Sequence, residues 1–211
     1  MPETAFEKRR ILIVIRQFYP LAAGAETQAL RQAVAYRRMG HDVTVVTARH
    51  DRALPRADVV EGVPVRRLCA PKMRFFGSAV FLLNLAAYLI GRRRDYDAVL
   101  VFHLKQPAMV ASILCPFLGK RVVISNQGAG RYGDFEALRN ALGGSIILRA
   151  CRLAHGFISV SGDMTKEFRE AGVPDEKVIF IPNAIPVREL SSLPSKSDIR
   201  KRLGLPSDAF I

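Results

Sequence analysis

The first stretch that could contact a ligand is a short loop around Gly24, between an apolar run at residues 11–15 and a helical pattern at residues 26–39. A glycine before a helix lets the backbone approach a ligand closely, and the helix start offers free N–H groups and a positive dipole end to a phosphate. A tight turn at Gly24 and a dipole-favoured acid at Glu26 explain the same residues without a ligand. Because only one glycine is present, the loop is not the G-x-G-x-x-G fingerprint, which argues against an NAD enzyme.

A second loop, residues 125–134, is richer in glycine and follows another apolar strand pattern. It lies where open α/β sheets hold ligands, beyond the carboxyl ends of the strands, so we expect it to contact a polar ligand. Asp134, at the end of this loop, is equally well explained as the N-cap of the next helix. The residues expected to form the loop site are Asn126, Gln127, Gly128, Gly130, Arg131 and Asp134.

His103 ends a third apolar strand pattern, residues 98–102, and so belongs to the same edge of the sheet. It is a weak candidate for a catalytic group, because no carboxylate stands at a fixed spacing from it and a lone histidine is more often structural. The histidines form no H-x-x-x-H pair, and no metal site is expected. Cys69, Cys115 and Cys151 are widely spaced in apolar surroundings, which predicts buried thiols and a reducing, cytoplasmic compartment.

Short β-branched runs alternate with longer helical patterns along the chain, which is typical of βαβ units and a parallel sheet. The fold class expected is therefore α/β, a Rossmann-like and mostly parallel sheet with helices on both faces. A small hairpin is expected over residues 59–65, turning at Glu61 and Gly62. The expected strands are residues 11–15, 43–47, 63–68, 98–102, 122–125, 156–160 and 178–181, and the expected helices are residues 26–39, 77–93, 107–118, 135–151 and 162–171.

The 211 residues suffice for one large α/β domain. After residue 181 the composition changes to a Pro- and Ser-rich linker, followed by a short helical pattern at residues 198–203. We expect one domain over residues 1–186, with residues 187–211 forming a linker and the start of a truncated second domain. The sequence is therefore interpreted as a fragment.

The formal net charge of +13 predicts an anionic partner: nucleic acid, an anionic membrane or a phosphorylated substrate. Solvated basic faces are the simpler alternative. No nucleic-acid-binding motif is present, so nucleic acid is not expected. The apolar run at residues 79–90 is shorter than the ~20 residues that span a bilayer. With Lys72, Arg74 and Arg92–Arg94 beside it, the run could lie on the inner face of an anionic membrane, or it is a core helix with basic ends.

Taken together, these patterns resemble the N-terminal, acceptor-side half of family-4 glycosyltransferases of the GT-B fold, over about residues 10–186. Each piece alone is weak, whereas their order and spacing are specific. Residues 198–211, with Leu203-Gly204-Leu205-Pro206, resemble the segment that introduces the donor domain. The pieces are Phe18-Tyr19-Pro20, the residues from Ala23 to Glu26, residues 40–47, residues 97–103, Ser159-Val160-Ser161 and residues 181–185.

The resemblance implies retaining, metal-independent transfer of a sugar from a nucleotide diphosphate donor to an acceptor held mainly by this half. The acceptor would be a polysaccharide, a glycolipid or a small glycoside, and no cofactor is implied. Gly24 and Glu26 would lie near the donor phosphates, with Ser161 and Asn183 near the interdomain cleft. The crevice would be formed by Gly24, Gly128 and Asn183. Residues 1–211 alone are expected to be inactive.

Three positions depart from the family pattern. Ala23 stands where a second glycine is usual, Gln127 where many members carry an active-site histidine, and Ala184 and Pro186 where an N-G-x-D hinge is common. Gln127 is therefore the second weak catalytic candidate. Because a fold does not fix a reaction, a sugar-nucleotide epimerase or a non-catalytic sugar-nucleotide-binding relative remains the alternative.

Overall fold

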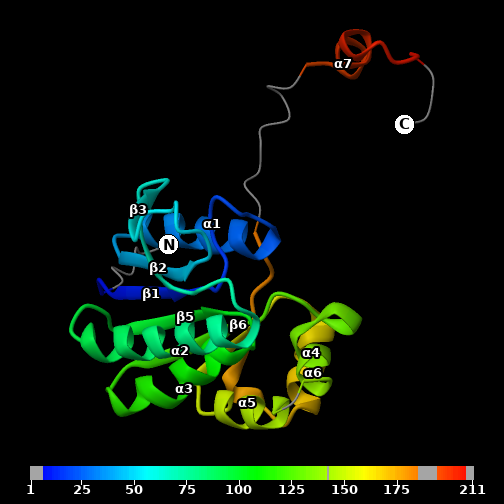
Figure 1. Ribbon diagram of the computed structural model, residues 1–211. Helices are drawn as coiled ribbons and strands as arrows, with labels where there is room; N and C mark the ends of the chain where they lie inside the picture. Colours follow the sequence, from blue (N-terminus) through cyan, green and yellow to red (C-terminus); the bar gives the residue numbers. More distant parts are fainter. Residues whose placement is uncertain (1–6, 142, 185–193, 208–211) are drawn as a thin grey trace.

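The computed structural model describes residues 7–141, 143–184 and 194–207 (Figure 1). The strands are β1 (Arg10–Val14), β2 (Asp42–Arg49), β3 (Ala57–Val60), β4 (Val63–Cys69), β5 (Ala98–Phe102), β6 (Arg121–Ser125), β7 (Gly156–Ser159) and β8 (Val178–Phe180). The α-helices are α1 (Gly24–Arg38), α2 (Arg74–Gly91), α3 (Gln106–Phe117), α4 (Asp134–Arg139), α5 (Gly144–Cys151), α6 (Gly162–Glu170) and α7 (Lys196–Leu203). Two short 3-10 turns, η1 (Gly130–Tyr132) and η2 (Asp175–Lys177), complete the described elements.

The strands form one sheet in the order β3-β4-β2-β1-β5-β6-β7-β8, parallel except for β3. The chain builds outward from β1 through β2 to β4, then returns to the other side of β1 to add β5 and its successors. The strand order therefore reverses between β1 and β5. Open α/β sheets bind ligands beyond the carboxyl ends of the strands at such a switch point, so the topology marks one place for a site.

Each face of the sheet is covered by helices, as the sequence predicts (Figure 1). On one face, α1 packs Ala29, Leu30 and Ala33 against alternate side chains of β1, β2 and β4. On the other, α2, α3 and α5 share a larger core with side chains from α4 and α6. The strands need apolar side chains on both faces because both faces are buried.

The predicted hairpin is present: β3 pairs antiparallel with β4, and Glu61 and Gly62 have φ of 48° and 77° in the turn. Arg67, on β4, is only 4% exposed. Its guanidinium donates to the Asp58 carboxylate at 2.8 Å and to the Tyr19 carbonyl at 3.0 Å. Arg67 thereby ties the hairpin to the loop between β1 and α1.

The single helix expected over residues 135–151 is wrong, because the chain forms two helices, α4 and α5, around Gly143. Gly143 has a φ of 78°, in the left-handed region that favours glycine. A side chain on Gly144 would place its Cβ 1.8 Å from the Leu138 carbonyl oxygen. The glycine pair therefore permits a close turn that a continuous helix would not form.

The cysteine prediction holds for two of the three residues. Cys115 and Cys151 are buried, and burial raises the pKa of each thiol, to about 11 and about 12. Cys69 is exposed, contrary to the expectation, because it ends β4 at the rim of the sheet. An apolar sequence neighbourhood did not guarantee burial at a strand end.

Among the described residues, no helix is both long enough and apolar enough to cross a membrane. The short helical pattern after the linker is present as α7, with Ser195 as its N-cap. Most of the linker predicted at residues 187–197 lies outside the described residues.

Candidate active site

A cavity of about 700 Å³ opens at the carboxyl edge of the sheet, at the β1–β5 switch point. Its polar lining comes from segments directly after four strands, with one residue from α1. These polar residues are Arg16, Gln17, Glu26, His50, Lys72 and His103. The cavity is thus large enough for a small ligand and stands where the topology predicts one.

Glu26 lines this cavity, but its carboxylate is already engaged. Its Oε2 accepts a hydrogen bond from the Ala23 N–H at 2.8 Å, which caps the start of α1. Within this chain, Glu26 therefore acts as an acidic residue that caps the start of the helix. Gly24 is different, because a Cβ added there would meet nothing within 4 Å and its φ is not positive. Neither space nor conformation within the described residues requires glycine at position 24.

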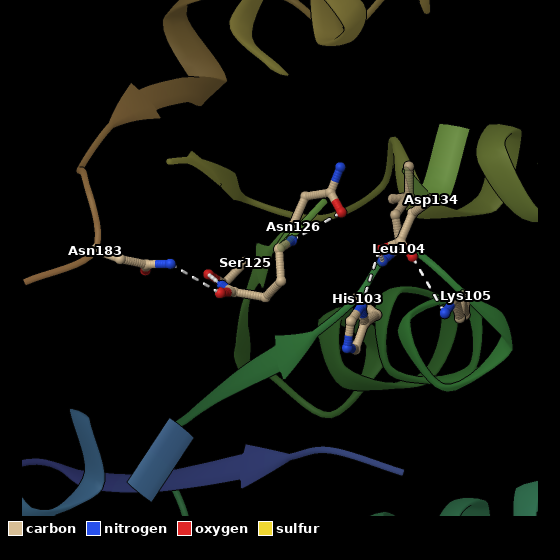
Figure 2. Close-up of polar contacts among 8 residues, drawn as sticks. His103, Leu104, Lys105, Ser125, Asn126, Asp134 and Asn183 are labelled. Atoms are coloured by element: carbon tan, nitrogen blue, oxygen red, sulfur yellow. Dashed lines mark hydrogen bonds and ion pairs between the residues drawn. The ribbon is translucent and has the colours of Figure 1, made fainter. Parts of the chain in front are cut away.

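His103 is held by a carboxylate that the sequence did not reveal. Its Nδ1 lies 3.2 Å from Asp134 Oδ2, although the two residues are 31 positions apart (Figure 2). His103 also has a φ of 71°, which is uncommon outside glycine and is found mostly where surrounding contacts enforce it. The structure therefore supplies the partner whose absence weakened His103 as a candidate.

Asp134 is 4% exposed and joins three groups. Besides His103, it accepts the Leu104 N–H at 2.8 Å and pairs with the Lys105 ammonium at 3.2 Å (Figure 2). Burial by itself would raise the pKa of Asp134, but the hydrogen bond and charge of His103, the charge of Lys105 and the Leu104 N–H outweigh it. The pKa is therefore lowered and the carboxylate stays charged.

Asp134 is not a helix N-cap. Gly133 occupies that position of α4, without a side-chain cap. Asp134 is the first residue of the helix, and its side chain turns to the loop after β5. Its contacts lie within the protein, and its place in a ligand loop stays a prediction.

The side-chain amides of the glycine-rich loop also form internal hydrogen bonds, except for Asn126 Nδ2, which is buried without a partner among the described residues. Asn126 is fully buried, and its Oδ1 accepts the Gln127 N–H at 2.9 Å. Gln127 Nε2 donates to Ser125 Oγ at 2.7 Å, and its Oε1 accepts from Asn183 Nδ2 at 3.3 Å (Figure 2). The loop therefore receives Asn183, but neither Gln127 nor Asn183 lines the cavity of about 700 Å³.

Backbone conformation and close packing explain two of the glycines in this loop. Gly130 has a φ of 69°, and its N–H donates to Glu167 Oε1 at 2.8 Å. A Cβ on Gly133 would lie 2.8 Å from the Gly128 carbonyl oxygen. Arg131 is exposed. Close packing of the loop on itself thus accounts for two of the glycines that suggested a ligand.

Ser161 is the N-cap of α6, where its Oγ accepts the Met164 N–H at 3.2 Å. The structure does not bring Ser161, Gly128 or Asn183 into the lining of the cavity beside His103. The structure places a cavity between the β1–α1 loop, the β4–α2 loop and His103, and the crevice of Gly24, Gly128 and Asn183 stays a prediction.

Sequence reasoning missed Arg16, Gln17, His50 and Lys72 as lining residues. A signal was present, since each follows the end of a predicted parallel strand within a few positions. Applying the strand-end rule to β1, β2 and β4, as it was applied to β5 and β6, would have selected them. Within residues 7–141, 143–184 and 194–207, no group of three or more His, Cys, Asp or Glu side chains is placed to hold a metal ion.

Fold and cavity together define a Rossmann-like α/β domain with a ligand crevice at its switch point. The profile of Glycosyltransferase Family 4 matches residues 22–189, and the chain belongs to this family. The match covers every element of the crevice except β1 and the residues immediately after it. No curated protein sequence matches the chain significantly.

Solved structures share the fold. HepE from Anabaena, determined in complex with UDP and glucose, is 18% identical, with a TM-score of 0.62 over 93% of this chain and 50% of its own. Sucrose-phosphate synthase from Thermosynechococcus elongatus is 16% identical, with a TM-score of 0.67 over 95% and 54%. A protein described as a UDP-N-acetylglucosamine 2-epimerase from Listeria monocytogenes is 10% identical, with a TM-score of 0.56 over 82% and 44%. The chain spans about half the length of these proteins.

Proposed function

We propose that this chain is the acceptor-side half of a longer enzyme that transfers a sugar from a nucleotide diphosphate donor to an acceptor, with retention of configuration. The observation that carries the proposal is the cavity at the switch point of a family-4 domain, lined by a histidine that a buried carboxylate orients. The donor would be held against this crevice by the second half, so residues 1–211 alone would be inactive.

His103 would contact a sugar hydroxyl in this scheme. The Asp134 carboxylate beside Nδ1 favours a proton on that nitrogen, which leaves Nε2 available for a hydrogen bond with a ligand. Because His103 lines the cavity, Nε2 can meet a hydroxyl placed there. Gly24, whose surroundings are open, would leave room for the donor phosphates at the start of α1.

The test is acceptor-dependent release of nucleoside diphosphate by the full-length protein, supplied with a panel of nucleotide sugars and acceptors. We expect a glycosylated product with the donor's anomeric configuration, and none from residues 1–211. Product with inverted configuration would contradict retention. Epimerised sugar nucleotide without acceptor product would instead favour the epimerase that one structural neighbour suggests.

Metal-independent transfer is part of the proposal, since the family resemblance implies it. Nucleotide sugar is the only small molecule required besides the acceptor. Full activity after treatment with EDTA is the expected result. Activity that is lost with EDTA and restored by a divalent cation would refute this part alone.

We also propose that the protein contacts an anionic membrane from the cytoplasmic side through α2. Phe81, Leu85 and Leu89 are buried in the core, whereas Leu83 and Ile90 on the opposite face are 71% and 44% exposed. Phe76, in the first turn of the helix, is 57% exposed. These apolar side chains recur at helical spacing and end at three arginines, Arg92–Arg94, an arrangement that suits an anionic bilayer surface.

Vesicle co-sedimentation tests the membrane contact. Binding to vesicles that contain phosphatidylglycerol should exceed binding to phosphatidylcholine vesicles, and Leu83→Ser should weaken it. Val59→Ser, at an apolar residue on β3 that is 63% exposed, is the control. Equal binding to both vesicle types would contradict the proposal without affecting the transfer activity.

A further inference from the structure

One side of the cavity beside His103 is lined by basic side chains. Arg16, His50 and Lys72 line that side, and each follows the end of a different strand: β1, β2 and β4. A second cavity of about 430 Å³ adjoins the first, sharing His50 and Lys72 and adding Arg49, Arg52 and the acidic Asp51. The two cavities thus form one cationic groove between the β2–β3 loop and the start of α2.

Not every cation in this groove is available to a ligand. Arg49 donates to the Leu54 carbonyl at 2.7 Å and to the Arg52 carbonyl at 2.5 Å, so its guanidinium holds the β2–β3 loop. Arg16 is exposed, donates to Ser78 Oγ at 2.9 Å and lies over the Phe81 ring, 5.8 Å from its centroid. These contacts fix its direction and leave further N–H groups, because a guanidinium has five.

Lys72 and His50 have unused hydrogen-bonding capacity. Within the described part of the chain, the Lys72 ammonium is in no ion pair within 4.0 Å. His50 Nδ1 is buried without a hydrogen-bond partner among the same residues. Because Nδ1 is buried, an anion in the open cavity would contact the imidazole elsewhere, and the site rests on the placement of Arg16, His50 and Lys72 around the cavity. Two acidic groups line the cavities: Glu26, which accepts the Ala23 N–H, and Asp51, which accepts the Ala53 N–H. The Ala53 N–H and the charge of Lys72 lower the pKa of Asp51, so Asp51 offsets part of the positive charge of the groove.

The start of α2 adds to the positive potential. Met73 is its N-cap without a side-chain cap, and the first turn carries no acidic residue. Pro71, Lys72 and Met73 line both cavities. A Cβ on Gly77 would lie 2.0 Å from the Pro71 carbonyl oxygen, so the segment is packed closely against the first turn of α2. The segment that carries Lys72 is therefore held in place by close packing against α2.

We propose that this groove binds a phosphate or diphosphate group carried by the acceptor, through Arg16, His50 and Lys72. A guanidinium, an imidazole and an ammonium converging from three loops match an anion with several oxygens. The identity of this group as part of an acceptor rests on the proposed sugar transfer; the anion site itself rests on the groove. Leu21 and Met73, 48% and 59% exposed, would border an apolar portion of the same molecule.

Binding of inorganic pyrophosphate to the 211-residue chain tests the site directly, by isothermal titration at low salt. Lys72→Ala should raise the Kd about tenfold, as expected for one lost charge-assisted contact. Lys166→Ala, at an exposed lysine on α6, is the matched control and should leave the Kd within about twofold. No measurable binding, or equal weakening by both substitutions, would overturn the anion site.

Transfer assays with the full-length protein then test the acceptor class. An acceptor with its phosphate should have a lower KM than its dephosphorylated form, and Lys72→Ala should erase that preference with little change in kcat. A lipid-linked phosphate in vesicles and a soluble sugar phosphate form separate arms, which identify the source. Equal KM values with and without phosphate would overturn the inference and leave sugar transfer standing. Failure to transfer to any acceptor, with Lys72-dependent pyrophosphate binding, would refute the transfer and not the anion site.

Discussion

Two regions at the carboxyl edge of the sheet use polar residues in opposite ways. The glycine-rich loop after β6 is rich in amides and charges, yet Asn126 Oδ1, Gln127 and Asp134 bond within the protein, while Asn126 Nδ2 is buried without a partner among the described residues. The groove beside the β1–α1 loop has fewer remarkable sequence features, yet its basic groups face a cavity. Polar density in a sequence marks where hydrogen bonds are needed, whereas ligand sites are marked by polar groups left without internal partners.

The largest difference that we expect between the two regions is in the free energy of unfolding. Asp134→Ala should lower the free energy of unfolding by about 3 kcal/mol, because it leaves the buried Leu104 N–H without its acceptor and removes the contacts to His103 and Lys105. Asp163→Ala, at an 85% exposed carboxylate, should cost less than about 1 kcal/mol. Urea denaturation measures both. Equal effects would show that the loop region does not depend on Asp134.

Alanine substitutions at two glycines should differ by a smaller amount in their effect on stability. Gly133→Ala should destabilise the chain by about 2 kcal/mol, because its Cβ would press on backbone atoms at 2.8–2.9 Å. Gly24→Ala should leave stability within about 1 kcal/mol of the wild type, since its site is open and alanine favours helix. In the full-length enzyme, however, Gly24→Ala should raise the KM for the nucleotide sugar. Destabilisation by Gly24→Ala equal to that by Gly133→Ala would remove the distinction.

The smallest expected effect is a pH dependence confined to the loop region. The lowered pKa of Asp134 means that its ionised form stabilises the folded chain above the unfolded pKa of about 3.9, and that this contribution is lost as the pH falls through the folded-state value. The stability difference between wild type and Asp134→Asn should therefore shrink as the pH falls below about 5. Denaturation across that range measures it. A constant difference would mean that the charge of Asp134 contributes nothing.

Most of the fold could be predicted because the strands are apolar on both faces. The boundaries of β5 match the prediction at both ends, and the hairpin turn at Glu61 and Gly62 is where the turn residues indicate. The break between α4 and α5 was missed because an apolar helical pattern continues on both sides. The pair Gly143-Gly144 was the signal for it.

The site could be predicted in location and only partly in composition. His103 was selected by its strand end, but its partner Asp134 is 31 residues away and no spacing rule joins them. The groove depends on three strand ends that meet only through the sheet order. Gln127 and Ser161 belong to polar segments whose hydrogen bonds are satisfied locally, which a sequence does not distinguish from bonds to a ligand.

The cavity beside His103, rather than the glycine-rich loop, should contact the reacting sugars. Acceptor-dependent transfer by the full-length enzyme tests this with two substitutions of similar size, His103→Ala and Gln127→Ala. His103→Ala should lower kcat/KM by about a hundredfold, and Gln127→Ala by less than about threefold, with both proteins folded. A hundredfold loss in Gln127→Ala with near-normal transfer by His103→Ala would contradict it.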